Sequence, residues 1–325
     1  MPLLPAYEAL IQTLGCNKSS DLPTKETIQN FRQAWRQFGK EEMAGKPAKI
    51  KFTDYKKQAY FKNPCEFRLY TPAPTYKNNM PLLLYFPGGG FIANDLGTNH
   101  VPCSHIAAQS GFQVITVHYK TAPEHPFPQG LRESYAMVDW LFEHAEKMEL
   151  DPKKISIGGD SSGGNFAALG THYAVNEKKY QVHRQILISP ATDLSRHLQQ
   201  FKTEYEDYDL LLSDALVERA YDLYVPETQE RQSPKISPYY IETQKLGNLP
   251  PTLILCGEYD RLRSDTEAYA EKLKKAGVMV TKKIYSGQTH AFLTIRQALN
   301  AKGDIGENPV DKIAAYLKES KDTLF

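Results

Sequence analysis

Ser161 stands in a setting that suits a nucleophile. Residues 159–163 read GDSSG, which fits the pattern G-x-S-x-G centred on this serine. The apolar residues 155–157 before it favour a short strand, and the small apolar residues 166–169 after it favour a helix. A serine on such a sharp turn exposes its hydroxyl, and the N-terminus of the helix favours negative charge beside it. Ser162 does not fit, because the pattern would then need glycine at position 160. A serine that merely caps the helix is the alternative interpretation.

A serine hydroxyl needs a base, and the base needs a carboxylate that orients it. Of the nine histidines, His290 is the one that follows the last predicted strand, in a loop after Tyr285. Asp260 lies in the loop after the preceding strand, at residues 252–256. The order serine, acid, histidine is one that serine-based catalysis uses. Glu258 and Asp265 are competing carboxylates, and loop position favours Asp260.

Three glycines supply a second element of such chemistry. Residues 87–91 read PGGGF and directly follow the apolar run 81–86. Glycines let backbone N–H groups face a cavity without obstruction by side chains. Acyl transfer needs donors for a developing oxyanion, and each is worth roughly a hundred- to a thousandfold in rate. We expect the N–H groups of Gly89, Gly90 and Ser162 to be these donors.

The elements that position these residues alternate between strands and helices. Continuous apolar runs suit parallel strands that are covered on both faces. Helical periodicity separates most of the later runs, and Gly277 is expected to end the helix that contains Tyr269 and Leu273. The pattern predicts an open, mainly parallel α/β sheet of eight strands with helices on both faces. The predicted strands are residues 52–60, 65–70, 81–86, 114–117, 155–157, 185–188, 252–256 and 278–285.

Two regions stand outside this alternation. Residues 193–249 are rich in tyrosine and charge and show helical periodicity around Leu216 and Tyr221. The first fifty residues place Ile28, Phe31 and Trp35 on one helical face. We expect a single domain over residues 1–325, with a helical cap built from about 1–48 and about 195–246. The tyrosines between positions 205 and 224 either line a pocket or pack the cap.

Composition narrows the class of protein. The chain has 325 residues, 41% hydrophobic and 24% charged, with a formal net charge of +1. That balance gives no electrostatic reason to expect nucleic acid or an anionic membrane as a partner. No apolar run reaches transmembrane length, and Glu8 with no basic leader argues against a secretory signal. We expect a cytoplasmic protein without an integral membrane segment. A homodimer is possible, and the sequence does not give the oligomeric state.

Metal and disulfide chemistry is not expected either. The four cysteines are scattered without paired or metal-type spacing, which favours reduced thiols. His100 and His105 lack a third ligand at useful spacing. Glu124 and His125 stand between two prolines and are expected to stabilise a turn rather than do chemistry.

Taken together, the ordered motifs resemble the hormone-sensitive-lipase-like branch of the α/β hydrolases from about Phe52 to the C-terminus. The resemblance implies an α/β-hydrolase fold with a helical cap and no cofactor. It also implies a carboxylesterase that cleaves short-chain acyl esters through a Ser161/Asp260/His290 triad and an acyl-enzyme intermediate. The motifs that carry it are PGGGF at 87–91, YKTAPEHPFP at 119–128, GDSSGGN at 159–165, DRLR at 260–263 and QTHAF at 288–292.

The chain departs from this family at three places. Pro87 stands where the family usually has histidine before the glycines, and proline brings no donor, so other hydrogen bonds must hold the loop. Lys120 and Thr121 replace the usual Arg-Leu, and Ser264, followed by Asp265, replaces a second acidic residue. We expect Asp160 to support the turn that presents Ser161.

Other functions share the same groups. A small-molecule-binding protein on the same fold is the alternative of a different class, and Pro87 is the feature that favours it. An amidase, a formamidase or a lactonase would use the same serine, acid and histidine. The substrate expected here is a small ester.

Overall fold

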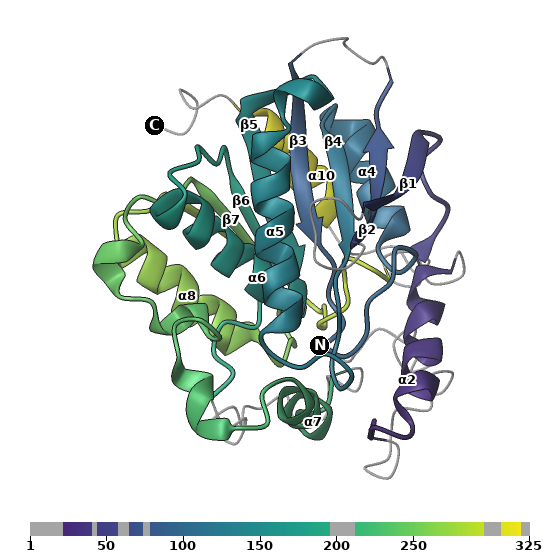
Figure 1. Ribbon diagram of the computed structural model, residues 1–325, viewed down its shortest axis with the longest axis vertical. Coiled ribbons are helices and arrows are strands. Elements are labelled where there is room, and N and C mark those ends of the chain that lie inside the picture. The colour runs from purple at the N-terminus through teal and green to yellow at the C-terminus, as the bar shows by residue number, and fades with distance from the viewer. Residues whose placement is uncertain are drawn as a thin grey trace.

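The computed structural model describes residues 22–40, 44–57, 65–73, 79–195, 212–295 and 307–319. Its centre is an eight-stranded sheet with the order β1-β2-β4-β3-β5-β6-β7-β8 (Figure 1). β2 pairs antiparallel with β1 and with β4, and the remaining neighbours are parallel. The predicted mainly parallel sheet of eight strands is confirmed. The strands are β1 Lys51–Lys57, β2 Cys65–Thr71, β3 Met80–Phe86, β4 Gln113–His118, β5 Leu150–Asp160, β6 Gln185–Ile188, β7 Thr252–Gly257 and β8 Val280–Tyr285.

The continuous apolar strands are explained by burial on both faces of the sheet. In β3, Leu82, Leu84 and Phe86 belong to one hydrophobic core cluster. The alternating residues Leu83 and Tyr85 belong to the other. Because successive side chains of a strand point to opposite faces, a strand between two layers of helices has to be apolar throughout.

Helices cover both faces, as predicted (Figure 1). α5, α6 and α8 pack on one face, and α4 and α10 pack on the other. Gly277, which was predicted to end α8, has a positive φ of 87° directly after the C-cap residue Ala276. These helices are α4 His100–Ser110, α5 Gln129–Glu143, α6 Ser161–His172, α8 Arg263–Lys275 and α10 Pro309–Lys318. Short helical turns are η3 Glu146–Met148 and η4 Tyr173–Glu177.

Two further helices lie beyond the edge of the sheet at which β3 and β5 end (Figure 1). They are α2 Ile28–Trp35, followed by η2 Arg36–Gly39, and α7 Asp214–Tyr224. Arg219 of α7 donates from Nε to the carbonyl of Pro23 at 2.9 Å, so the two regions predicted to form a cap are in contact. Parts of that cap, including residues 1–21 and 196–211, lie outside the described residues, and its boundaries stay a prediction. Three short turns follow α7: η6 Thr228–Gln232, η7 Pro238–Tyr240 and η8 Thr243–Lys245.

The elements around Ser161 are longer than the sequence pattern predicted. β5 spans Leu150–Asp160 instead of residues 155–157, and α6 begins at Ser161 itself rather than near 166. Serine, glycine and asparagine are weak helix formers, so local propensity conceals the first turn of α6. Packing overrides propensity here, because a Cβ on Gly163 would overlap the carbonyl oxygen of Phe86 in β3. Only glycine lets the helix approach the strand this closely.

The ends of two strands also differ from the predicted ends by a few residues. β1 ends at Lys57 rather than at residue 60, and β8 begins at Val280 rather than at 278. Asn63-Pro64, whose residue types favour a hairpin turn between the first two predicted strands, lies outside the described residues. Such ends are set by the last hydrogen-bonded pair, which sequence patterns do not locate.

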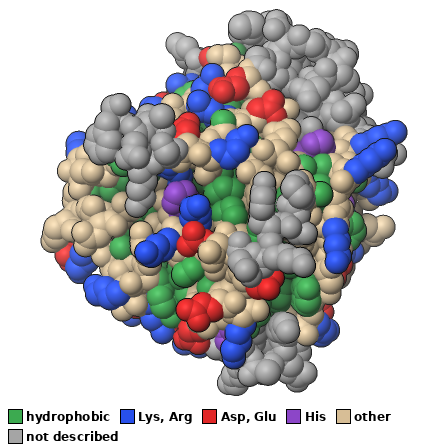
Figure 2. All heavy atoms as spheres, turned by 90° about the horizontal axis from the view of Figure 1, so that it is seen from above, with side chains coloured by type: hydrophobic (Ala, Val, Ile, Leu, Met, Phe, Trp, Pro, Cys, Tyr) green, Lys and Arg blue, Asp and Glu red, His purple; other side chains and the backbone are tan. Residues whose placement is uncertain are grey.

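Charged side chains of both signs occur across the face shown in Figure 2. This mixture agrees with the formal net charge of +1. Within the described ranges, none of the helices combines the length and the apolar composition that crossing a bilayer requires.

Candidate active site

Ser161 occupies the turn between β5 and α6 in a left-handed conformation. Its φ is +56°, a region that a residue with a side chain rarely adopts. Such strain persists only where the surrounding structure imposes it, and it concentrates at functional sites. As the first residue of α6, Ser161 places its hydroxyl at the N-terminus of a buried helix. The geometry matches the sharp strand-to-helix turn that the sequence predicts.

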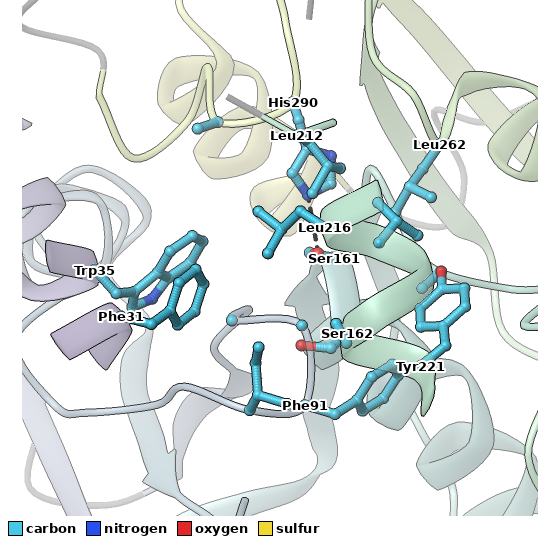
Figure 3. A pocket seen from close by; sticks show the side chains of 17 residues that line it. Phe31, Trp35, Phe91, Ser161, Ser162, Leu212, Leu216, Tyr221, Leu262 and His290 are labelled. Carbon is cyan, nitrogen blue, oxygen red and sulfur yellow. Dashed lines mark hydrogen bonds between the residues drawn. The ribbon is translucent and has the colours of Figure 1, made fainter. Parts of the chain in front are cut away.

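Three residues predicted from the sequence meet in one hydrogen-bonded series, and Figure 3 shows the contact between His290 and Ser161. His290 Nε2 lies 2.9 Å from Ser161 Oγ, and His290 Nδ1 lies 2.8 Å from Asp260 Oδ1. An ionised carboxylate only accepts hydrogen bonds, so Nδ1 carries the proton and donates it. This tautomer leaves Nε2 as the acceptor for the Ser161 hydroxyl. The arrangement can remove the hydroxyl proton as oxygen attacks an electrophile.

Asp260 is held as a carboxylate by its surroundings. Its Oδ1 also accepts from the N–H of Leu262 at 2.8 Å, and the Cys256 thiol lies 3.4 Å from Oδ2. Burial by itself would raise the pKa of Asp260, but the charge of the neighbouring His290 and hydrogen bonds from His290 and Leu262 outweigh it and bring the pKa below its ordinary value. The charge therefore persists at neutral pH and stabilises an imidazolium on His290.

The two competing carboxylates, Glu258 and Asp265, accept hydrogen bonds from other groups. Glu258 Oε2 accepts from the N–H of Gly287 at 2.8 Å and so shapes the loop that carries His290. Asp265, which is buried in the first turn of α8, accepts from the N–H of Asp193 at 3.0 Å through Oδ2. Of the three candidates, Asp260 is the one whose carboxylate contacts His290.

The glycine loop after β3 forms a tight turn beside Ser161. Gly89 and Gly90 have φ values of +141° and +61°, and the N–H groups of Ile92 and Ala93 both donate to Gly89 O. A Cβ on Gly89 would overlap the carbonyl oxygen of Ala93. Among the described residues, no acceptor forms a hydrogen bond with the N–H group of Gly89 or of Gly90. These N–H groups are available to an oxygen atom of a ligand.

Ser162 contributes to the same place. It is the second residue of α6, and the first N–H groups of a helix have no partner inside the helix. The residue as a whole, backbone included, is buried, and it borders the pocket beside Ser161. The three backbone donors predicted from the sequence thus border one pocket with Ser161.

Neighbouring side chains hold the loop despite Pro87. Tyr119, which is buried, donates from its hydroxyl to Pro87 O at 2.5 Å. Asp160 Oδ1 accepts from the N–H of Gly88 at 3.0 Å and from the Tyr85 hydroxyl at 2.7 Å. Asp160 therefore ties the turn before Ser161 to the glycine loop. The sequence assigned no role to Tyr119, although it lies inside a recognised motif.

A largely apolar pocket opens over Ser161 (Figure 3). It encloses about 590 Å³, part of which is open to solvent. Phe31 and Trp35 of α2 form one wall, and Leu216 and Tyr221 of α7 lie on another side. The lining residues are Phe31, Trp35, Gly89, Gly90, Phe91, Ile92, Ser161, Ser162, Ala191, Leu212, Leu216, Val217, Ala220, Tyr221, Leu262, His290 and Ala291.

Both interpretations of the tyrosine-rich region apply, each to a different residue. Tyr221 lines the pocket, whereas Tyr224 stacks on Phe91 with ring centroids 4.1 Å apart and an interplanar angle of 2°. Tyr205 and Tyr208 lie outside the described residues. Periodicity alone could not separate these roles, because both tyrosines lie on the buried side of α7.

Arg32 anchors the wall that α2 contributes. Its Nε donates to Ile92 O at 2.8 Å, and its two terminal nitrogens donate to Thr121 Oγ1, Ala122 O and the Glu124 carboxylate. The shortest of these contacts, to Glu124 Oε2, is 2.6 Å. Five donors in a planar fork suit such a set of acceptors. No sequence signal marked Arg32, because its acceptors lie some sixty to ninety residues away.

The remaining candidates lie away from the pocket. His100 Nδ1 is 3.2 Å from Arg68 and 3.1 Å from the Tyr70 hydroxyl, and His105 Nε2 contacts Lys46 O. Glu124 pairs with Arg32, and the N–H of His125 donates to Thr121 O. In the described part of the chain, no group of three or more His, Cys, Asp or Glu residues is placed to hold a metal ion.

Comparison with known proteins agrees with this geometry. A family model described as the α/β-hydrolase fold matches residues 83–294. The carboxylesterase NlhH of Mycobacterium tuberculosis is 31% identical over 238 residues, which cover 73% of this chain and 74% of NlhH. An arylesterase of Saccharolobus solfataricus is 27% identical over 90% of this chain and 93% of its own.

A solved structure extends the likeness over the whole chain. The hyperthermophilic esterase of the archaeon Pyrobaculum calidifontis superposes with a TM-score of 0.85 at 29% identity, covering 100% of both chains. The resemblance to the hormone-sensitive-lipase-like branch is confirmed. The chain belongs to the α/β-hydrolase family.

Proposed function

We propose that this protein is a serine carboxylesterase that hydrolyses short-chain acyl esters. The observation that carries the proposal is the series Ser161–His290–Asp260, which ends in an apolar pocket beside two unpaired backbone N–H groups. The relatives named above are called carboxylesterase, arylesterase and esterase, which supports ester hydrolysis. The pocket over Ser161 is lined mainly by apolar side chains, which suits the acyl chain of a small ester.

The proposed reaction proceeds in two steps. Ser161 Oγ attacks the ester carbonyl carbon as His290 Nε2 takes its proton, and the carbonyl oxygen becomes an oxyanion among the N–H groups of Gly89, Gly90 and Ser162. The imidazolium then protonates the leaving alcohol as the carbon–oxygen bond breaks. A water molecule repeats the cycle on the acyl-enzyme and releases the carboxylic acid. Asp260 holds neutral His290 in the tautomer that accepts the proton and stabilises the imidazolium that forms.

Covalent labelling tests the proposal most directly. A fluorophosphonate should modify Ser161 stoichiometrically, as located by peptide mass spectrometry, and should abolish hydrolysis of p-nitrophenyl acetate. Failure to label would favour a small-molecule-binding protein on the same fold. Labelling together with a preference for anilides, formamides or lactones over esters would assign the same site to an amidase, formamidase or lactonase.

Acyl-chain length should govern the rate. Among p-nitrophenyl esters, kcat/KM is expected to be highest for short acyl chains and to fall by roughly tenfold or more as the chain outgrows the pocket. The aromatic wall of Phe31 and Trp35 limits the space beside Ser161, so Trp35→Ala should move the maximum to a longer chain. A maximum at long chains in the unmodified protein would contradict short-chain specificity.

Arg32 should matter for substrate binding more than for chemistry. Arg32→Met removes five hydrogen bonds that hold α2, so KM for p-nitrophenyl butyrate should rise by roughly tenfold while kcat changes little. Arg36→Met is the matched control, because Arg36 is exposed and lies 3.7 Å from Asp95. An exposed ion pair contributes little, so this variant should behave like the wild type. Equal KM values for the two variants would contradict an anchoring role for Arg32.

A further inference from the structure

A chain of hydrogen bonds runs beneath the candidate active site, from the glycine loop to the loop that carries His290. The N–H of Gly88 donates to Asp160 Oδ1 at 3.0 Å, and Asn99 Nδ2 donates to the same oxygen at 3.1 Å. On its other side, Asn99 Oδ1 lies 3.1 Å from Thr294 Oγ1. Asn99 is 2% exposed and Thr294 is 7% exposed, so both links are shielded from water.

The chemistry of the partners determines the orientation of the Asn99 amide. Asp160 Oδ1 already accepts from Tyr85 and Gly88, and a carboxylate offers no proton in return. The amide nitrogen must therefore face Asp160, and the amide oxygen then accepts from the Thr294 hydroxyl. Enclosure raises the pKa of Asp160, and the Tyr85 and Gly88 donors act against that rise. An amide both donates and accepts, so it can bridge a carboxylate and a hydroxyl.

The side chain of Asn99 does not cap α4, although Asn99 stands at the N-cap position of that helix. It is the N-cap residue of α4, where asparagine is common because its side chain can accept from a backbone N–H of the first turn. Here the side chain makes no capping hydrogen bond. It instead spans the gap between Asp160 and Thr294.

The two loops that Asn99 joins follow strands that are not neighbours in the sheet. The glycine loop follows β3 and the His290 loop follows β8, with β5, β6 and β7 between these strands. The front of the His290 loop is held by the acid loop, because Tyr259 N donates to Gln288 O and Gly287 N to Glu258. Thr294 closes the turn directly after His290, with its N–H donating to Ala291 O at 2.9 Å. The bond from Thr294 to Asn99 therefore holds the rear of that loop.

We propose that Asn99 is a positioning residue that, through Asp160 and Thr294, holds the oxyanion-binding glycine loop and the His290 loop in register with each other. The inference rests on the proposed esterase function. Breaking either link lets the imidazole and the oxyanion donors shift relative to each other without removing any group that touches the substrate. Misplacement of about 1 Å can cost up to about a hundredfold in rate.

A fall in kcat at an unchanged KM distinguishes a positioning residue from one that only stabilises the fold. Acylation and deacylation use the same imidazole and the same oxyanion donors, so both steps should slow alike. KM for p-nitrophenyl acetate then stays near its wild-type value while kcat falls by about tenfold. Because the apolar pocket is untouched, substrate binding gives no other reason for a change in KM.

Thr294→Val tests the link with little change in shape, since it replaces the hydroxyl by a methyl group. Thr294→Ser restores the hydroxyl and should restore kcat to within about twofold of the wild type. Asn99→Ala should match Thr294→Val, and the double variant should be no slower than either, because all three break the same link. Thr171→Val is the matched control: its hydroxyl is buried, and among the described residues its hydrogen-bond partner is Ala167 O within α6.

Steady-state kinetics, melting temperature and the rate of fluorophosphonate labelling should be measured on all five variants. The proposal predicts slower turnover and slower labelling in Thr294→Val and Asn99→Ala, and neither effect in Thr171→Val. A loss of melting temperature without a loss of kcat, or additive losses in the double variant, would overturn it. If the wild type neither labels nor hydrolyses esters, the proposed function fails instead.

Discussion

Ser161→Ala is expected to lower kcat for p-nitrophenyl acetate by at least about ten-thousandfold. The hydroxyl oxygen is the atom that bonds to the carbonyl carbon, and alanine offers no substitute. Residual turnover should come from water attacking within the intact oxyanion site. Steady-state kinetics with active-site titration of the wild type measures the ratio.

The neighbouring serine supplies the comparison. Ser162→Ala keeps the backbone N–H that is proposed to bind the oxyanion and removes a hydroxyl that is fully buried. It should cost at most about tenfold, and it should still be labelled by a fluorophosphonate. If Ser161→Ala retained most of the activity, or if the label moved to Ser162, Ser161 would be removed from the mechanism.

Asp260→Asn should also cost about ten-thousandfold in kcat. The amide can present an N–H to His290, which would drive the imidazole into the tautomer with its proton on Nε2 and leave no acceptor for the Ser161 hydroxyl. Asparagine also lacks the charge that stabilises the imidazolium. KM should change little, because the Asp260 side chain does not line the pocket.

Glu258→Gln is the matched control, since Glu258 was the nearest competing carboxylate in the sequence. Its neutral side chain can still accept from Gly287, so the loss in kcat should stay within about tenfold. A larger effect of Glu258→Gln than of Asp260→Asn would assign the orienting carboxylate to Glu258.

Stability gives a second test of Asp260, through its lowered pKa. A carboxylate whose pKa is lower in the folded than in the unfolded state stabilises the fold above its ordinary pKa of about 3.9. That contribution is lost as the pH falls through the lower, folded-state pKa. Urea unfolding should therefore show Asp260→Asn to be less stable than the wild type at pH 7, with the difference shrinking in acid. A constant difference across pH would contradict the lowered pKa.

Much of the candidate site could be predicted because its chemistry restricts the sequence locally. The turn around Ser161 requires small residues on both sides, so its glycines appear as a motif at fixed spacing. The backbone donors at Gly89 and Gly90 need glycine for the same steric reason. His290 and Asp260 could be located because each follows a predicted strand, and neighbouring parallel strands end at one edge of the sheet.

The choice between Asp260 and Glu258 illustrates what local patterns leave open. Both carboxylates belong to the loop after β7, and they are two residues apart. Which of them reaches His290 depends on the direction of each side chain in the folded loop, where Glu258 faces Gly287 instead. The roles of Tyr221 and Tyr224 could not be predicted for the same reason. Helical periodicity indicates the buried side of α7 but not whether a pocket or another side chain lies against it.

By itself, the sequence predicted the eight strands along the chain, the residues proposed as nucleophile and base, the glycine loop, and the family. These follow from steric and periodic constraints that act over a few residues. The tertiary structure alone decided which acid faces His290, how Tyr119 and Asp160 hold the loop after Pro87, and how Arg32 anchors α2. It also brought Asn99 to Thr294, 195 positions away. A hydrogen bond between distant segments leaves no spacing in the sequence, because its partners are set by how the whole chain packs.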